Sequence, residues 1–258
     1  MTERAPDSAL SAKMCYFAAM FSTLTPAMHS IEPIAIIESP YKEKFAVPRQ
    51  PRLVPSATAR ARLTGEINCQ EAVRGIEQFS HLWLLFLFDQ NLAAGWKPTV
   101  RPPRLGGNER IGVLASRSTF RPNGIGMSAV ELRGVSKQDE QIYLDLGSVD
   151  LVDGTPIIDI KPYIPYSDAI SDATGGYADA EPERAEVQFA PAAAACLVGL
   201  PDATNKQAVI EEVLSQDPRP AYKKNKPDSK EYAVNLYDMN VKFIVNDNLV
   251  TVTAIERF

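Results

Sequence analysis

The apolar run Leu82-Trp83-Leu84-Leu85-Phe86-Leu87-Phe88 decides the fold class of this chain. None of its residues is polar, and a short run rich in aromatic side chains has the length and composition of a strand. A strand without any polar position is typical of one that is buried on both of its faces. The run therefore predicts a buried strand in the core of a β structure.

Further short strands are predicted on both sides of this run, several of them with alternating polar and apolar residues. They span residues 34–39, 59–63, 110–116, 128–135, 142–146 and 155–163. Ala72, Ile76 and Phe79 recur at helical spacing, so a short helix is predicted over residues 71–79. Twenty prolines against fourteen glycines favour short strands and shaped loops. The pattern predicts a mainly β fold, either a barrel or a sandwich.

The C-terminal third has a different composition. Residues 167–186 hold six acidic side chains and one basic one, which predicts an acidic linker. Beyond it, residues 203–215 have a helical pattern, and residues 232–246 and 249–255 alternate as two strands around the turn Asn246-Asp247-Asn248. We therefore predict a disordered extension over residues 1–30, a barrel over 31–166, a linker over 167–190 and a small α+β domain over 191–258.

Cysteine, histidine and apolar content exclude several kinds of site. Cys15, Cys69 and Cys196 are odd in number and far apart, so a reducing compartment is the simpler interpretation. The chain has two histidines, too few for a multi-histidine metal site. No apolar run reaches the roughly 18–20 residues that span a bilayer. We expect a cytoplasmic chain with no membrane segment and no metal.

The charges are unevenly distributed. The net charge of −5 does not by itself indicate a nucleic-acid partner. However, residues 41–62 hold six basic side chains against one acidic, and so do residues 96–121. Such basic segments would let a net-acidic protein hold a phosphate backbone, although charge runs are often only solvated surface.

Two loops have residues suited to binding anions. In Pro48-Arg49-Gln50-Pro51 the flanking prolines limit backbone freedom, so Arg49 can be held towards a carboxylate or phosphate. A rigid surface turn is the alternative. Residues 112–127 combine Arg117 and Arg121 with hydroxyls and end in the two glycines Gly124 and Gly126, whose backbone amides can bind anionic groups. The glycine spacing does not fit a dinucleotide-binding motif.

A third stretch is rich in aspartate. Asp150, Asp153 and Asp159 lie near predicted strand ends, where a carboxylate could bind a ribose diol or act as a base. Asp153 lies in Asp-Gly-Thr-Pro, an ordinary turn sequence. His81 follows Ser80, but no nucleophile-elbow motif supports a serine hydrolase, so a structural role for His81 is favoured.

Several motifs, taken together and in order, resemble the TrmO (TsaA-like) family of tRNA methyltransferases. They are Ser39-Pro40-Tyr41-Lys42-Glu43-Lys44-Phe45 through Pro51, Phe79-Ser80-His81-Leu82-Trp83, Arg101-Pro102-Pro103-Arg104-Leu105-Gly106-Gly107-Asn108, residues 117–126, 151–155 and 159–163, and Gln216-Asp217-Pro218-Arg219-Pro220-Ala221-Tyr222. The resemblance covers most of residues 31–258. Members of the family often have proline in place of Gly124 and histidine in place of Asp89. We expect Gly124 to loosen its loop.

The resemblance implies a TsaA-like β-barrel that binds S-adenosylmethionine, with a homodimer as the assembly. It also implies methylation of N6 of threonylcarbamoyladenosine at position 37 of threonine tRNA. The residues it assigns to the cofactor are Pro48, Arg49, Gln50, Asp89, Gln90, Arg117, Met127, Gly147, Ser148, Val149 and Asp150.

Catalytic and RNA-binding roles follow from combining this resemblance with the chemistry of the side chains. A modest general base would suffice for the acceptor nitrogen, and the candidates with their supporting groups are Asp150, Asp159, Lys161 and Tyr163. The anticodon stem-loop would be held by Lys42, Lys44, Arg101, Arg104, Arg121, Arg219 and Lys223. Two alternatives stay open, a methyltransferase of a different substrate and a barrel that binds S-adenosylmethionine or RNA without turnover.

Overall fold

The computed structural model describes residues 29–219, 223 and 228–258. The chain divides into two compact units, Met1–Glu32 and Pro33–Phe258, and all the helices and strands below belong to the second. The predicted N-terminal extension lies almost wholly outside the described residues.

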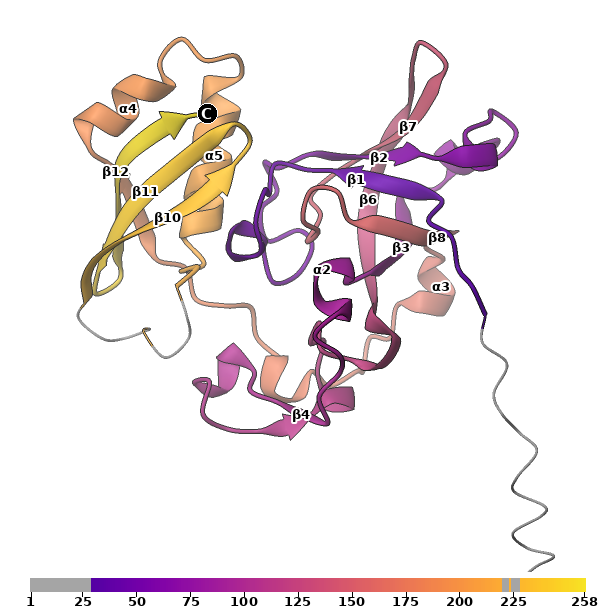
Figure 1. The fold of residues 1–258 in the computed structure, drawn as a ribbon, viewed down its shortest axis with the longest axis horizontal. Helices are drawn as coiled ribbons and strands as arrows, with labels where there is room; N and C mark the ends of the chain where they lie inside the picture. The colour runs from indigo at the N-terminus through magenta and orange to yellow at the C-terminus, as the bar shows by residue number, and fades with distance from the viewer. Residues whose placement is uncertain (1–28, 220–222, 224–227) are drawn as a thin grey trace, which may run out of the picture. The chain divides into compact units, whose positions relative to one another are not determined.

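Within the described residues, six strands close into an antiparallel barrel (Figure 1). They are β1 (Ala35–Glu38), β2 (Ala59–Leu63), β3 (His81–Leu87), β6 (Ile125–Gln138), β7 (Gln141–Leu146) and β8 (Pro156–Pro162). Their order is β1-β2-β7-β6-β3-β8, and β8 closes the sheet by pairing with both β1 and β3. The mainly β fold and the barrel are confirmed.

Strand β3 differs from its prediction in burial. Leu82, Leu84 and Phe86 are buried, whereas the alternate residues of the strand are only partly buried. The prediction of burial on both faces is therefore wrong. A closed barrel has one interior, so successive residues point alternately into the core and outwards. Trp83 and Leu85 occupy outward positions and therefore lie on the outer face of the barrel.

Two predicted elements before β6 take other forms. Residues 71–79 form turns and the 3₁₀ helix η3 (Ile76–Gln78) instead of an α-helix, because Gly75 has φ +84° and interrupts the helical path. Residues 110–116 contain only the short strand β5 (Ile111–Gly112), followed by η5 (Val113–Ala115). Strand β5 pairs with β4 (Thr99–Val100).

The segment between β3 and β6 consists of short elements. After β3 it includes α2 (Asp89–Leu92) and η4 (Pro103–Leu105), and it returns to the barrel through η6 (Pro122–Gly124). The loop between β1 and β2 carries η1 (Lys44–Ala46), and η2 (Gly65–Ile67) follows β2. The loop between β1 and β2 and the segment between β3 and β6 carry most of the basic residues of the segments 41–62 and 96–121.

The C-terminal region is an α+β structure, as predicted. Its sheet has the order β10-β11-β12-β9, with β9 (Glu186–Phe189), β10 (Asp228–Leu236), β11 (Met239–Asn246) and β12 (Leu249–Arg257). The helices are α4 (Pro191–Leu197) and α5 (Ala203–Leu214). The predicted strand over 232–246 is in fact two strands, because Tyr237 has φ +56° in a turn between them. The acidic segment contains α3 (Pro165–Asp168) and η7 (Gly176–Ala178).

The loop after β1 is joined to strand β10 by backbone hydrogen bonds. Tyr41 forms a bridge with Leu236, and the amide of Lys42 donates to the carbonyl of Asn235 at 3.2 Å. The amide of Asn235 donates to Glu43 Oε1 at 3.1 Å. Tyr41 is fully buried in a core shared by barrel and C-terminal residues. The C-terminal sheet therefore fixes the start of the loop that carries Pro48, Arg49 and Gln50.

Candidate active site

The loop that follows β7 carries a buried polar cluster. Oδ1 of Asp150 and Oγ of Ser148 are buried atoms without a hydrogen-bond partner among the described residues. Burial raises the pKa of Asp150 to about 6, while a hydrogen bond with Ser128 and the charge of Arg117 act in the opposite direction. Buried polar groups without partners are costly and occur mainly where a ligand or water satisfies them. The loop therefore offers unpaired oxygens to a ligand.

Gly147 brings this loop close to strand β6. A Cβ atom on Gly147 would lie 2.4 Å from Oε2 and 2.9 Å from Cβ of Glu131. Contacts this short do not occur between real Cβ atoms and their neighbours. Glycine is thus required here for the close approach of the two segments, which holds Ser148 and Asp150 against the end of the barrel.

Gln50 connects the proline-flanked loop to the same region. Arg117 donates a hydrogen bond through NH1 to Oε1 of Gln50, and the charge of Arg117 acts on Asp150. Residues 50, 117 and 150 come from three separate loops. The structure thus brings together three of the predicted cofactor residues.

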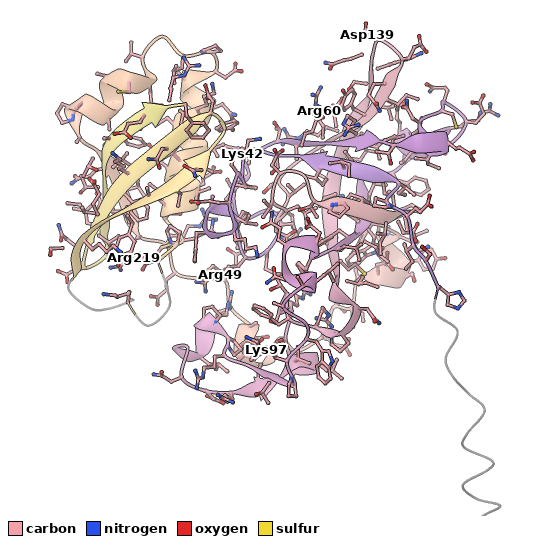
Figure 2. The ribbon with its side chains drawn as sticks, in the orientation of Figure 1. Lys42, Arg49, Arg60, Lys97, Asp139 and Arg219 are labelled. Atoms are coloured by element: carbon pink, nitrogen blue, oxygen red, sulfur yellow. The ribbon has the colours of Figure 1, made fainter. Side chains whose placement is uncertain are left out.

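Arg49 has different neighbours from Gln50. It lines a cavity of about 210 Å³ together with Pro103 and with Val213, Asp217 and Arg219 of the C-terminal region. Burial and the nearby charge of Arg104 lower the pKa of Arg49. Figure 2 labels Arg49 and Arg219. Arg49 and Gln50 are consecutive in the sequence, but their side chains contact different groups of residues.

The remaining residues assigned to the cofactor lie on β6 and α2. Met127 has an exposed fraction of 56% on the outer face of β6. Asp89 begins α2, and Lys44 Nζ donates to the carbonyl of Gln90 at 3.4 Å and to Asn91 Oδ1 at 3.0 Å. Gly124 has φ +61°, a value closed to proline, whose ring fixes φ near −65°. A chain with proline at this position must therefore follow another path here.

The other candidate catalytic residues lie apart from Asp150. Ser128, which bonds Asp150, is buried and pairs with Leu84, whereas Asp159 pairs with the adjacent residue Leu85. Since successive residues alternate between the two faces of a sheet, Asp159 is on the outer face. There its Oδ2 lies 2.7 Å from Nζ of Lys161. Tyr163 packs at 5.6 Å from the ring of Trp83.

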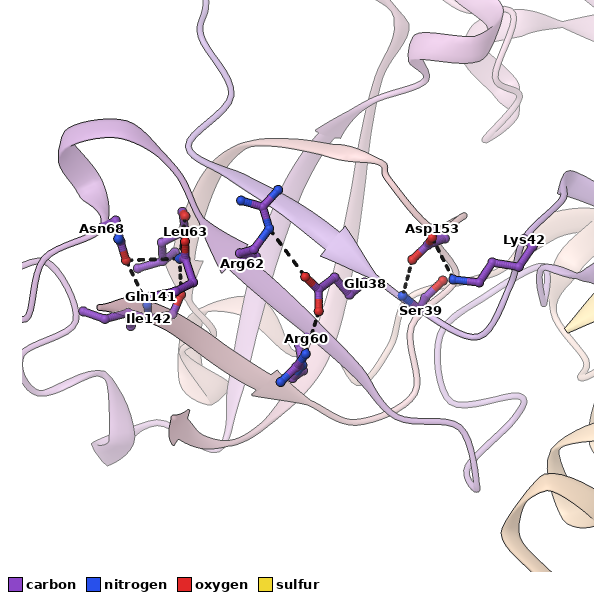
Figure 3. A network of polar contacts seen from close by, with 10 residues as sticks. All are labelled: Glu38, Ser39, Lys42, Arg60, Arg62, Leu63, Asn68, Gln141, Ile142 and Asp153. Carbon is purple, nitrogen blue, oxygen red and sulfur yellow. Dashed lines mark hydrogen bonds and ion pairs between the residues drawn. The ribbon is translucent and has the colours of Figure 1, made fainter. Parts of the chain in front are cut away.

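The predicted RNA-binding residues have a range of contacts. Lys42 Nζ lies 2.8 Å from Asp153, whose Oδ1 accepts from the amide of Ser39, as Figure 3 shows. Arg104 donates to the carbonyl of Ala180, and Arg121 to that of Ser116. Arg219 is bound to Asp217 through two side-chain hydrogen bonds of 2.8 and 3.0 Å. Arg101 is exposed and Lys223 is half-buried.

Two positions were missed by sequence analysis. Ser128 occupies an inward-facing position of β6, and a polar residue in the apolar phase of an alternating strand is the signal that could have revealed it. Glu212 of α5 accepts hydrogen bonds from Ser56, which is 156 residues away in the chain. No local pattern predicts a contact at that separation.

The described residues contain neither a metal-binding cluster nor a helix that could span a membrane. Their histidine, cysteine and carboxylate side chains form no cluster of three or more that could hold a metal ion. Among the same residues, every helix is too short or too polar to span a lipid bilayer.

Comparison with known proteins identifies the class of this barrel. The model of the tRNA-methyltransferase O N-terminal domain matches residues 36–169, and that of the TrmO C-terminal domain matches residues 182–258. The chain therefore belongs to the TrmO family.

Individual relatives agree with this assignment. The tRNA (adenine(37)-N6)-methyltransferase of Escherichia coli K12 is 52% identical over 227 residues, covering 87% of this chain and 97% of that protein. RcsF of Pseudomonas aeruginosa, whose name includes the words S-adenosylmethionine-dependent methyltransferase, is 48% identical and covers 83% of this chain and 91% of that protein. The crystal structure of TrmO from Pseudomonas aeruginosa covers 89% of this chain and 99% of its own, at a TM-score of 0.71 and 37% identity.

Proposed function

We propose that this protein is an S-adenosylmethionine-dependent tRNA (adenine(37)-N6)-methyltransferase. Membership of the TrmO family and 52% identity to an enzyme of that name support the reaction. The observation that carries the proposal is the pair of buried, unpartnered oxygens of Ser148 and Asp150 beside Arg117 and Gln50. We further propose that the acceptor is the threonylcarbamoylated adenosine of threonine tRNA.

The residues around Asp150 fit S-adenosylmethionine. The cofactor would supply an electrophilic methyl group on a cationic sulfur, together with hydroxyl and amino groups that donate hydrogen bonds. Oγ of Ser148 and Oε1 of Gln50 are acceptors for such donors, and Arg117 is a partner for the carboxylate. Gly147 and Val149 would form the backbone wall of the same site. These groups would orient the methyl group for displacement, which is mainly a matter of positioning.

Asp150 is the residue that we assign as general base. Methyl transfer would form a bond between the methyl carbon and N6 of the adenosine and break the bond between that carbon and the sulfur, so that S-adenosylhomocysteine leaves. The proton of N6 must also leave. The carboxylate of Asp150 would accept it, since a pKa of about 6 keeps it mostly ionised at neutral pH yet basic enough to be useful. Asp159 is paired with Lys161 on the outer face of the sheet, so we do not assign it this role.

The basic side chains of the two long loops are proposed to hold the RNA. Arg101, Arg104 and Arg121 belong to the segment between β3 and β6, and Lys42 and Lys44 to the loop after β1. Lysine and arginine neutralise phosphates without reading the sequence. They would present the anticodon loop to the barrel, where a single-stranded base can leave its stack.

A homodimer is proposed as the active assembly. The outer face of the barrel leaves apolar side chains in solvent, and so does the segment between β3 and β6. Their exposed fractions are 56% for Met127, 58% for Trp96 and 79% for Leu114. Where exposed apolar groups form a contiguous patch, that patch commonly marks a protein interface. A second copy of the chain would cover them.

The test is methyl transfer from labelled S-adenosylmethionine to threonine tRNA with and without the threonylcarbamoyl group. We expect label only in the carbamoylated RNA. Label in unmodified RNA or in a small molecule would identify a different substrate. Binding of cofactor and RNA with no transfer to either tRNA would identify a binding protein without turnover.

A further inference from the structure

The cavity beside Arg49 has no role in the proposed methyl transfer, yet its composition is that of a ligand site. Its volume of about 210 Å³ is many times the roughly 10–15 Å³ that one water requires. Part of its wall is apolar, including Val47, Pro48 and Val213. Ligand sites commonly combine such walls with a few converging polar groups.

The charges around this cavity are not balanced. Asp217 is the acidic residue of the lining, and Arg219 already binds both of its carboxylate oxygens. The guanidinium of Arg49 has no hydrogen-bond or ion-pair partner among the described residues, and Arg104 adds a second positive charge nearby. Burial and the like charge of Arg104 lower the pKa of Arg49, whereas the charge of Asp217 acts in the opposite direction. An anion in the cavity would remove the imbalance.

The position of the cavity indicates which anion it takes. Arg49 and Gln50 are consecutive, so their Cα atoms are about 3.8 Å apart. Gln50 is bonded to Arg117, which acts on the proposed general base Asp150. The two sites therefore share one loop as a wall. A group attached to the reacting nitrogen could extend from the Asp150 side to the Arg49 side.

We propose that this cavity binds the carboxylate of the acyl-amino-acid group on N6 of the substrate adenosine, with Arg49 as its cationic partner. The inference rests on the proposed function. It names the group of the substrate by which the enzyme would select the modified adenosine. The planar guanidinium would donate two hydrogen bonds to the carboxylate oxygens, and Val47 and Val213 would contact the aliphatic part of the group.

The experiment compares two anticodon stem-loop RNAs that differ in one group. One carries the threonylcarbamoyl adenosine, and the other carries the same group with its carboxylate replaced by a carboxamide. For the wild-type protein we expect the carboxamide RNA to have about a 10- to 100-fold lower kcat/KM, because it cannot form the charged hydrogen bonds with Arg49. Equilibrium binding with S-adenosylhomocysteine present should show the same preference.

Arg49→Gln should lower kcat/KM for the carboxylate RNA and leave the carboxamide RNA almost unchanged, so that the preference disappears. Arg49→Lys should restore part of it, because the charge remains without the bidentate geometry. Arg74→Gln is the control, since Arg74 is exposed and, among the described residues, its side chain is paired with Glu71 alone. Affinity for S-adenosylmethionine, measured by calorimetry, should be unaffected by Arg49→Gln.

Three outcomes would overturn the inference. The first is equal turnover of the two RNAs by the wild type. The second is an equal loss of kcat/KM on both RNAs in Arg49→Gln, which would indicate a phosphate contact. The third is weaker binding of S-adenosylmethionine by that variant. Binding separates the inference from the proposed function. If neither RNA is methylated but the wild type binds the carboxylate form more tightly, the cavity assignment stands and the reaction is wrong.

Discussion

Glu212 of α5 accepts two hydrogen bonds from Ser56, one from its backbone amide at 2.9 Å and one from its hydroxyl at 2.8 Å. The linker before β9 adds a contact, because Arg184 donates to the carbonyl of Leu53 at 3.2 Å. Ser56 and Leu53 both follow Pro48, Arg49 and Gln50 in the loop between β1 and β2. The C-terminal region thus holds both ends of the loop that separates the two proposed sites.

Glu212→Ala should therefore impair the proposed cofactor site from a distance. It leaves two donors of Ser56 unpaired, which should destabilise the protein by about 1–3 kcal/mol and raise the Kd for S-adenosylmethionine. Thermal unfolding and calorimetry would measure the two effects. The control is Glu211→Ala, since Glu211 accepts from the exposed side chain of Gln207 on the same helix. Equal behaviour of the two variants would show that the contact with Ser56 does not position the loop.

Asp150→Asn should reduce kcat by about 10²- to 10⁴-fold, the usual contribution of a general base. In the wild type, kcat should rise with pH through about pH 6, because the carboxylate must be ionised to accept the proton. The profile of the variant should be flat in this range. Single-turnover methylation between pH 5 and 8 would measure both. A wild-type profile without an inflection near pH 6 would argue against Asp150 as the base.

The raised pKa of Asp150 also predicts how the stability of the ligand-free protein depends on pH. Its pKa is higher in the folded protein than the ordinary value of 3.8, so the folded state binds the proton more tightly. The contribution of Asp150 to the free energy of unfolding is therefore complete below about pH 4 and is lost as the pH rises through about 6. The loss amounts to about 3 kcal/mol at most, from about 1.4 kcal/mol per pKa unit.

Asp150→Asn should remove this pH dependence, because the amide does not titrate. The free energy of unfolding of the wild type should fall relative to that of the variant between pH 4 and pH 7. Urea denaturation at several pH values would measure the difference. Parallel curves for the two proteins across this range would show that Asp150 is not desolvated in the folded state.

Gly147→Ala should weaken cofactor binding, because the added Cβ would lie 2.9 Å from Cβ of Glu131 and must displace either β6 or the loop. We expect an increase of at least several-fold in the Kd for S-adenosylmethionine. The matched control is Gly112→Ala, where an added Cβ has no atom within 4 Å. Unchanged cofactor affinity in Gly147→Ala would remove this loop from the proposed cofactor site.

Local patterns in the sequence predicted much of the barrel. Residues 59–63 form β2 as predicted, and the helix predicted over 203–215 is α5, Ala203–Leu214. Alternation and helical spacing depend on neighbours within a few residues, so they can be recognised without knowledge of the fold. The errors arose where a local choice depends on backbone conformation, as at Gly75 and Tyr237, both with positive φ.

Consecutive residues were enough to predict the class of the protein, because they contain the β-strand patterns and the ordered motifs. They also indicated the loops that carry the candidate site. The three-dimensional fold was needed to show which residues of these loops meet. It placed Asp150 with Ser128 in the interior and Asp159 on the outer face, and it separated Arg49 from Gln50. Barrel closure and contacts between distant segments set these positions, and neither is encoded in the residues nearby.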